Sequence, residues 1–171
     1  WGDYGKQLLQ SGRFGEAAES FSRYLRQHPD DLGTHLMYGQ ALRALGLDNE
    51  AMDEVGFVLS RQPKSVPALA LLGDIMRKVG HLEEALDLYQ TALREDPSRF
   101  EIWHNLAAVF ALLQRWKEAA SSAAEAIHLS PTFWQAHLCL GLALCRQKLY
   151  EDADISLREA HKLSGGHAAA C

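Results

Sequence analysis

The chain has 171 residues and a formal net charge of −5, with 47% hydrophobic and 23% charged residues, as in an ordinary globular protein. A general nucleic-acid binder would normally show a basic face and a high pI, so the acidic balance argues against nucleic acid as a partner. No apolar run approaches the roughly 18 to 20 residues that cross a bilayer, and the opening WGDYGKQ is not a secretory signal, so we expect no membrane insertion.

The three cysteines do not make a disulfide framework in a chain of this size. Cys139 and Cys145 are six positions apart on one expected helix. Their Cα atoms would therefore be about 9 Å apart, which is beyond disulfide reach. Reduced thiols favour a cytoplasmic location, with a periplasmic location as the alternative.

A period of 34 residues (63 − 29, 97 − 63 and 131 − 97) runs through the chain, and prolines mark it at Pro29, Pro63, Pro97 and Pro131. Alanines keep the same step at Ala17, Ala51, Ala85, Ala119 and Ala153, and small residues keep it at Gly5, Gly39, Gly73, Ala107 and Gly141. Because no residue is inserted between these columns, each unit should stack on the previous one in the same geometry. The period predicts one domain over 1–163, with repeats at about 1–31, 32–65, 66–99, 100–133 and 134–163, and a short disordered tail at 164–171.

Each unit contains two amphipathic helices, which the stretch 66–99 shows most regularly. Apolar residues follow i, i+3, i+4, i+7 spacing on both sides of Gly80, so this stretch is predicted to be a helical hairpin with a glycine turn. The turn column reads Gly12, Gly46, Gly80, Gln114 and Lys148. Gly73 of the first helix should face Ala85 of the second, because two small residues let the backbones approach closely.

The second unit departs from the repeat pattern at two positions, and two helix starts carry a capping sequence. Asp48 stands in a column that is otherwise Phe14, Leu82, Trp116 and Tyr150, and Gly56 lies in mid-helix, so we expect the second hairpin to be the loosest. Capping-box sequences at 98–101 and 132–135 predict two helix starts.

The chain begins inside a repeat pattern, and the residues after Leu163 are too few for a closing helix. We therefore expect a fragment of a longer protein, or a last hairpin covered by a partner or by a second copy.

These columns resemble the tetratricopeptide repeat family over nearly the whole chain. The third unit carries the family pattern at Leu72, Gly73, Gly80, Ala85, Tyr89, Ala92 and Pro97, and the fourth unit adds Trp103, Leu106, Trp116, Ala119, Ala126 and Pro131. The resemblance implies an all-α fold, a right-handed α-solenoid of five antiparallel helix hairpins. It also implies a concave groove lined by the first helix of each hairpin.

Residues for catalysis or metal binding do not form a recognisable motif. No two of the eight histidines are spaced i, i+4 on one helix, and neither Cys-x-x-Cys nor His-Glu-x-x-His occurs. His104 and Cys139, on neighbouring first helices, are interpreted as an ordinary polar contact beside a buried thiol. Glycine-rich phosphate loops are also missing, so we expect no cofactor, no metal and no enzyme activity.

The groove is where we expect binding. Its predicted residues, projected from the first helices, are Leu36, Met37, Gln40, Arg43, Ala70, Leu71, Asp74, Arg77, Lys78, His104, Asn105, Ala108, Leu112, Leu138, Cys139, Leu142 and Arg146. Leu36, Leu71 and Leu138 have no evident core to join, unless a neighbouring repeat covers them. Basic groove residues outnumber acidic ones. The hypothesis is a peptide ligand, partly apolar and partly acidic, bound extended or as a short helix.

Two specialised branches of the family do not fit. The carboxylate clamp of chaperone-binding members needs Lys, Asn and Arg side chains at fixed positions of three consecutive repeats. At those positions only Asn105 matches, so we exclude a carboxylate-clamp chaperone binder. The asparagine ladder of O-linked sugar transferases fails as well. Three functions stay open: a peptide-binding adaptor or scaffold, a scaffold that self-associates through uncapped ends, and a substrate-recognition or targeting domain of a larger enzyme.

Overall fold

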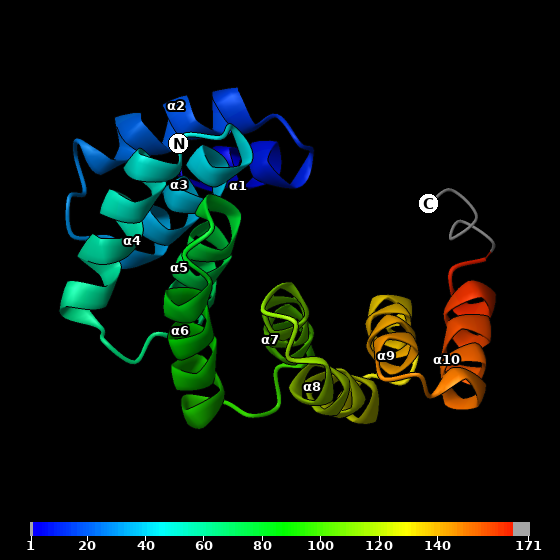
Figure 1. The fold of residues 1–171 in the computed structure, drawn as a ribbon. Coiled ribbons are helices and arrows are strands. Elements are labelled where there is room, and N and C mark those ends of the chain that lie inside the picture. The colour runs from blue at the N-terminus through cyan, green and yellow to red at the C-terminus, as the bar shows by residue number, and fades with distance from the viewer. Residues whose placement is uncertain (1, 166–171) are drawn as a thin grey trace. The chain divides into compact units, whose positions relative to one another are not determined.

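The structure, a computed structural model, describes residues 2–165, and within them it contains ten helices and no strand (Figure 1). The helices are α1 (Gly2–Gln10), α2 (Phe14–Leu25), α3 (Leu32–Ala44), α4 (Asp48–Arg61), α5 (Val66–Val79), α6 (Leu82–Glu95), α7 (Phe100–Leu112), α8 (Trp116–Leu129), α9 (Trp134–Arg146) and α10 (Tyr150–Leu163). The all-α prediction is confirmed. Trp1 and most of the expected tail, 166–171, lie outside the described residues.

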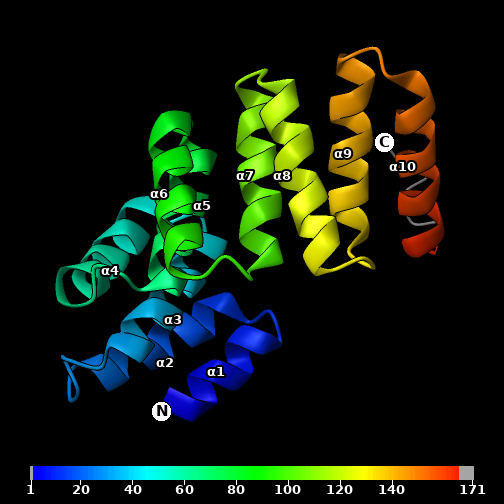
Figure 2. The ribbon, with the colours of Figure 1, turned by 90° about the horizontal axis from the view of Figure 1, so that it is seen from below.

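The chain forms two compact units, Trp1–Val79 and Gly80–Cys171, here called the N-terminal unit and the C-terminal unit. In the N-terminal unit each of the helices α1 to α5 packs on the next, and α3 also contacts both α1 and α5. In the C-terminal unit α6 to α10 follow one another in the same sequential way (Figure 2). Helix α7 also contacts α9. Within each unit the first helices of successive hairpins therefore lie side by side, as the 34-residue period predicts.

The glycine column marks the closest approach inside the hairpins. A Cβ on Gly5 would lie 2.5 Å from Cε1 of Phe21, and one on Gly141 would lie 2.6 Å from Cγ of Leu157 and 3.3 Å from the carbonyl oxygen of Ala153. The small residue thus faces the alanine column, as expected, and also a larger side chain one turn further along the second helix. In both hairpins, replacing the glycine with any other residue would push the first helix away from the second.

All five hairpin turns use the same left-handed conformation. The φ angle is positive at Gly12, Gly46 and Gly80, and also at Gln114 (59°) and Lys148 (63°). Because a side chain makes this conformation costly, the last two turns carry local strain that glycine avoids in the others.

The two predicted capping boxes are wrong. The N-caps of α7 and α9 are Arg99 and Phe133, one residue later than the motifs require, and neither makes a side-chain cap hydrogen bond. Ser98 Oγ instead donates to Asp96 Oδ1 at 2.6 Å. The repeat places the N-cap at the position of Asp31, which does cap α3 by accepting from the Thr34 backbone N–H at 3.1 Å.

Candidate peptide-binding surface

The basic groove residues of the N-terminal unit lie on α3 and α5, and two of them are already paired. Arg43 Nη1 is 3.8 Å from Asp74 Oδ2, and Lys78 Nζ donates to Asp48 Oδ1 at 2.9 Å. Arg77 is half-buried, and its Nε has no hydrogen-bond partner among the described residues. The basic surplus that the sequence predicts is therefore smaller on this surface, because internal carboxylates neutralise part of it.

The expectation that Leu71 is an apolar groove residue without a core is wrong. Leu71 is only 5% exposed and belongs to a buried cluster with Leu42, Val55 and Ile75. Its Cδ2 lies 3.5 Å from where a Cβ on Gly39 would be, so the glycine of α3 makes room for it. The helix projection missed this contact because α5 packs against α3 as well as against α4.

Other apolar groove residues of the N-terminal unit are also partly used in packing. Leu36 packs against the cluster that contains Leu71, and Met37 packs against a second cluster that includes Leu8 and Phe21. Gln40, one turn along α3, is half-buried. This surface therefore offers polar and basic groups rather than a continuous apolar stripe.

The C-terminal unit is different, because here the groove residues of α7 and α9 leave apolar side chains in solvent. Leu112 is 56% exposed and Leu142 is 55% exposed, and Leu138 is half-buried on the same helix as Leu142. Arg146 is exposed beside them, with its guanidinium carbon 5.6 Å from the ring centroid of Trp116. We call Leu112, Leu138, Leu142 and Arg146 the α7–α9 face.

The polar groove residues of the C-terminal unit are half-buried. His104 lies edge-on to the ring of Phe133, with centroids 5.2 Å apart, and Asn105 follows it on α7. Cys139 on α9 is also half-buried, and burial raises the pKa of its thiol to about 11. The thiol is thus protonated at neutral pH, so this site does not supply an activated nucleophile.

Three ring nitrogens make a recurring contact that the sequence did not reveal. Nε2 of His35, Nε1 of Trp103 and Nε2 of His137 each lie 2.8 to 2.9 Å from the carbonyl oxygen of the proline six residues earlier. His35 Nδ1 also bonds Glu54 Oε2 at 2.5 Å. These rings join a first helix to the turn before it, which gives His35 and His137 a structural role.

Within the described residues, no group of three or more His, Cys, Asp or Glu side chains is arranged to hold a metal ion. None of the helices in residues 2–165 is both long enough and apolar enough to span a bilayer.

Family models described as tetratricopeptide repeat match residues 8–75, 70–132 and 113–167. Among solved structures, the chain is similar to a crystal structure of MamA, with 21% identity, a TM-score of 0.83 and coverage of 99% of each chain. It is also similar to the structure titled MamA 41-end from Desulfovibrio magneticus RS-1, with 19% identity, a TM-score of 0.83 and coverage of 96% of this chain and 93% of that one. At these identities the likeness shows the fold. No curated protein matches the sequence. Since the family models together span most of its length, the chain belongs to the tetratricopeptide repeat family.

Proposed function

We propose that this protein is a non-enzymatic adaptor or scaffold that binds a peptide segment of a partner protein on the exposed faces of its first helices. The observation that supports this most is the exposure of Leu112 and Leu142 on the adjacent helices α7 and α9. Tetratricopeptide repeats serve in general for protein interaction, and a partner that covers both side chains would remove apolar surface from water.

The chemistry of the surface also suggests the chemistry of the ligand. Arg146 stands beside Leu142 on the α7–α9 face, and in the N-terminal unit Arg43 and Arg77 lie on the corresponding first helices. A segment with apolar residues for the leucines and a carboxylate for Arg146 would match this face. Reduced cysteines are consistent with a cytoplasmic location, which remains our prediction.

Self-association by stacking a copy on the last hairpin has less support. Ala18 of α2 belongs to a buried cluster that includes Ala41 of the next first helix, and Met52 of α4 packs against a cluster that includes Ala68 of α5. The equivalent residue of α10 is Asp154, which accepts from Arg158 Nε at 2.7 Å on an exposed surface. Stacking there would desolvate this ion pair, which offsets part of the gain from covering the exposed Tyr150.

A matched pair of substitutions tests the proposal. Peptides selected from a random phage-displayed library on the full chain would be labelled, and their affinities measured by fluorescence polarisation. Leu142→Asp should weaken binding by at least about tenfold, because burying one leucine contributes about 1.5–3 kcal/mol. Ile155→Asp, which changes a still more exposed apolar residue on α10, should leave the affinity unchanged.

Two outcomes would count against the proposal. One is a selection that yields no peptide, and the other is an equal loss of affinity in both variants. If the mass of the wild-type chain instead rises with concentration in sedimentation experiments, and Leu142→Asp prevents this rise, the α7–α9 face is a contact between copies.

A further inference from the structure

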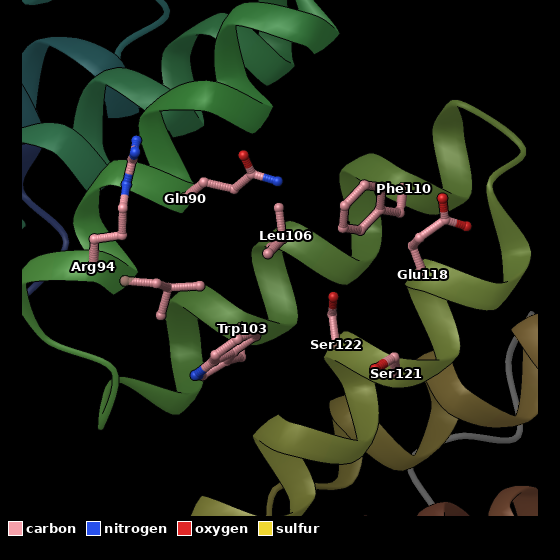
Figure 3. Close-up of a pocket in the computed structure, with 9 residues that line it drawn as sticks. Gln90, Arg94, Trp103, Leu106, Phe110, Glu118, Ser121 and Ser122 are labelled. Carbon is pink, nitrogen blue, oxygen red and sulfur yellow. The ribbon is translucent and has the colours of Figure 1, made fainter.

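A second candidate site lies on the other side of α7, in a cleft of about 490 Å³ between α6, α7 and α8 of the C-terminal unit (Figure 3). Its floor is formed by Leu93, Leu106 and Phe110, and its rim carries Arg94, Glu118 and Ser121. We call this the α6–α8 cleft. Its volume falls within the roughly 300–1,000 Å³ of typical ligand pockets.

The cleft and the α7–α9 face do not share residues. Side chains two positions apart on a helix differ in direction by about 160° around the helix axis, so they lie on nearly opposite sides. Phe110 therefore points away from Leu112, and Leu106 points away from Ala108. A ligand in the cleft would contact the second helices α6 and α8 and the side of α7 between them, whereas the ligand proposed above contacts the opposite side of α7.

Short side chains on α8 explain why the space is open. The wall that α8 contributes contains Ser121 and Ser122, within the run Ala119–Ala124, which has no side chain larger than serine. Figure 3 shows both serines on α8, on the opposite side of the cleft from Gln90 and Arg94 of α6. Longer residues at these positions would reach toward Leu93 and fill the space.

One end of the cleft has a rigid aromatic wall. Trp103 lines it, and the indole Nε1 donates to the carbonyl oxygen of Pro97 at 2.9 Å, which fixes the ring. From Trp103 to Phe110 the floor runs along seven residues of helix, or about 10 Å. This length matches about three residues of an extended peptide.

Of the two charged side chains on the rim, Glu118 is already paired within the protein, whereas Arg94 has no carboxylate partner among the described residues. Glu118 Oε1 accepts from Arg115 Nε at 3.0 Å. A hydrogen bond from its own backbone N–H, together with Arg115, keeps the pKa of Glu118 below its ordinary value, so this carboxylate is ionised and already compensated. Arg94 is exposed, and its Nη2 donates to the neutral Thr91 Oγ1 at 2.8 Å. Because a guanidinium has five N–H donors, most of those on Arg94 are available to a ligand carboxylate.

We infer that the α6–α8 cleft binds an extended peptide segment of a partner protein, in which an apolar side chain enters between Trp103 and Phe110 and an acidic residue next to it pairs with Arg94. The apolar side chain supplies the burial and the carboxylate sets the orientation of the segment. The occupant is thus a polypeptide with an apolar residue and an acidic residue within about three positions.

The test uses the full chain and three labelled peptides in one Gly/Ser frame, with Phe and Glu, Phe and Lys, or Ser and Glu at the two key positions. Amide chemical shifts recorded during titration give both the affinity and the location of binding. The Phe–Glu peptide should shift resonances around Trp103 and Ser121, and should bind at least about tenfold tighter than the Ser–Glu peptide. Arg94→Glu should invert the preference between the Phe–Glu and Phe–Lys peptides.

A tyrosine that fills the cleft can be compared with a matched tyrosine placed outside it. Ser121→Tyr should abolish binding, whereas Ala124→Tyr, at another exposed position of α8 outside the cleft, should leave it intact. Circular dichroism and thermal melting would verify that both variants fold. Leu142→Asp should not change the affinity of this site, which separates it from the α7–α9 face.

The inference is overturned if Ser121→Tyr binds the Phe–Glu peptide like the wild type, or if the shifts map to the α7–α9 face. It is also overturned if the chain forms a dimer that Ser121→Tyr dissociates, because a second copy would then be the occupant.

Discussion

Lys78 Nζ donates a hydrogen bond to Asp48 Oδ1 at 2.9 Å, and these residues are thirty positions apart (78 − 48) in neighbouring repeats. Trp116 and Arg146 have the same spacing (146 − 116) and the same repeat positions, and they meet through a cation–π contact. An ion pair and an aromatic contact thus make the same connection between consecutive hairpins. Asp48, which departs from an apolar column, is compensated by Lys78.

A double-mutant cycle of Asp48→Ala and Lys78→Ala should measure this connection. The Asp48 side chain is 20% exposed and that of Lys78 is about half exposed, so we expect a coupling free energy of about 0.5–1 kcal/mol from urea unfolding midpoints. As a control, the double variant Asp48→Trp, Lys78→Arg should reproduce the arrangement of Trp116 and Arg146 and recover the wild-type midpoint. A coupling of zero would mean that the second hairpin has no compensation for Asp48.

Glycine in the last two turns should stabilise the protein. Gln114→Gly and Lys148→Gly each remove a side chain from a left-handed residue, and each should raise the free energy of unfolding by about 0.5–1 kcal/mol. Gly46→Ala, at φ +80°, is the reverse control and should lower it. Thermal unfolding of the three variants would show whether the sign follows the φ angle.

The glycine column offers a paired test of close packing. Gly141→Ala should destabilise by about 1–3 kcal/mol, because the new Cβ would lie 2.6 Å from Leu157 Cγ. Gly56→Ala, where a Cβ meets nothing within 4 Å, should instead stabilise by up to about 1 kcal/mol. Both effects are readable from chemical denaturation, and equal effects at the two positions would contradict the packing argument.

Adding Leu157→Ala should partly relieve the clash in Gly141→Ala. The fourth repeat already pairs these columns as Ala107 and Ala123, and both residues are fully buried. No relief in the double variant would show that the Ala153 carbonyl, 3.3 Å from the same Cβ, is the limiting contact.

Truncation of Leu71 should destabilise the protein much more than truncation of Leu142. Leu71→Ala should cost about 2–4 kcal/mol of unfolding free energy, because it leaves a cavity in the core of the N-terminal unit. Leu142→Ala should change it by less than about 0.5 kcal/mol, because the side chain is mostly in solvent. Urea denaturation of both variants measures the two changes in unfolding free energy. A large loss for Leu142→Ala would show that Leu142 is covered in solution.

Cys139 should react slowly with iodoacetamide. Its pKa, raised from 9.0 to about 11 by burial, leaves little thiolate at pH 8. In a Cys145→Ser, Cys171→Ser background, alkylation of the native chain should be much slower than that of the urea-unfolded chain. Rapid native alkylation would contradict the burial of this thiol.

The same shift has a consequence for stability. The unfolded thiol ionises near pH 9 while the folded one stays protonated up to about pH 11. The folded state therefore holds more protons in this window, and the free energy of unfolding should fall as the pH rises from 9 to 11. Cys139→Ala should reduce this slope, and an unchanged slope would assign it to other groups.

Sequence reasoning worked where the determining pattern is short-range. The 34-residue period located every hairpin, and the turn column located every turn, because the helix period and turn geometry depend on a few neighbouring positions. It failed at the helix starts: the motif at Ser98 matched a capping box, but the repeat begins each first helix after the column of Asp31 and Arg99.

By itself, the sequence determined that this chain is a series of five helical hairpins, since the 34-residue period runs without insertion. It also determined the family, because models of the tetratricopeptide repeat match most of the chain. Only the tertiary structure decided which groove residues are accessible. Leu71 and Leu142 have the same character on a helix projection, but Leu71 fills the space that Gly39 leaves on α3, while Leu142 meets solvent. The α6–α8 cleft likewise depends on three helices and the short side chains facing between them, which a pattern within one helix does not reveal.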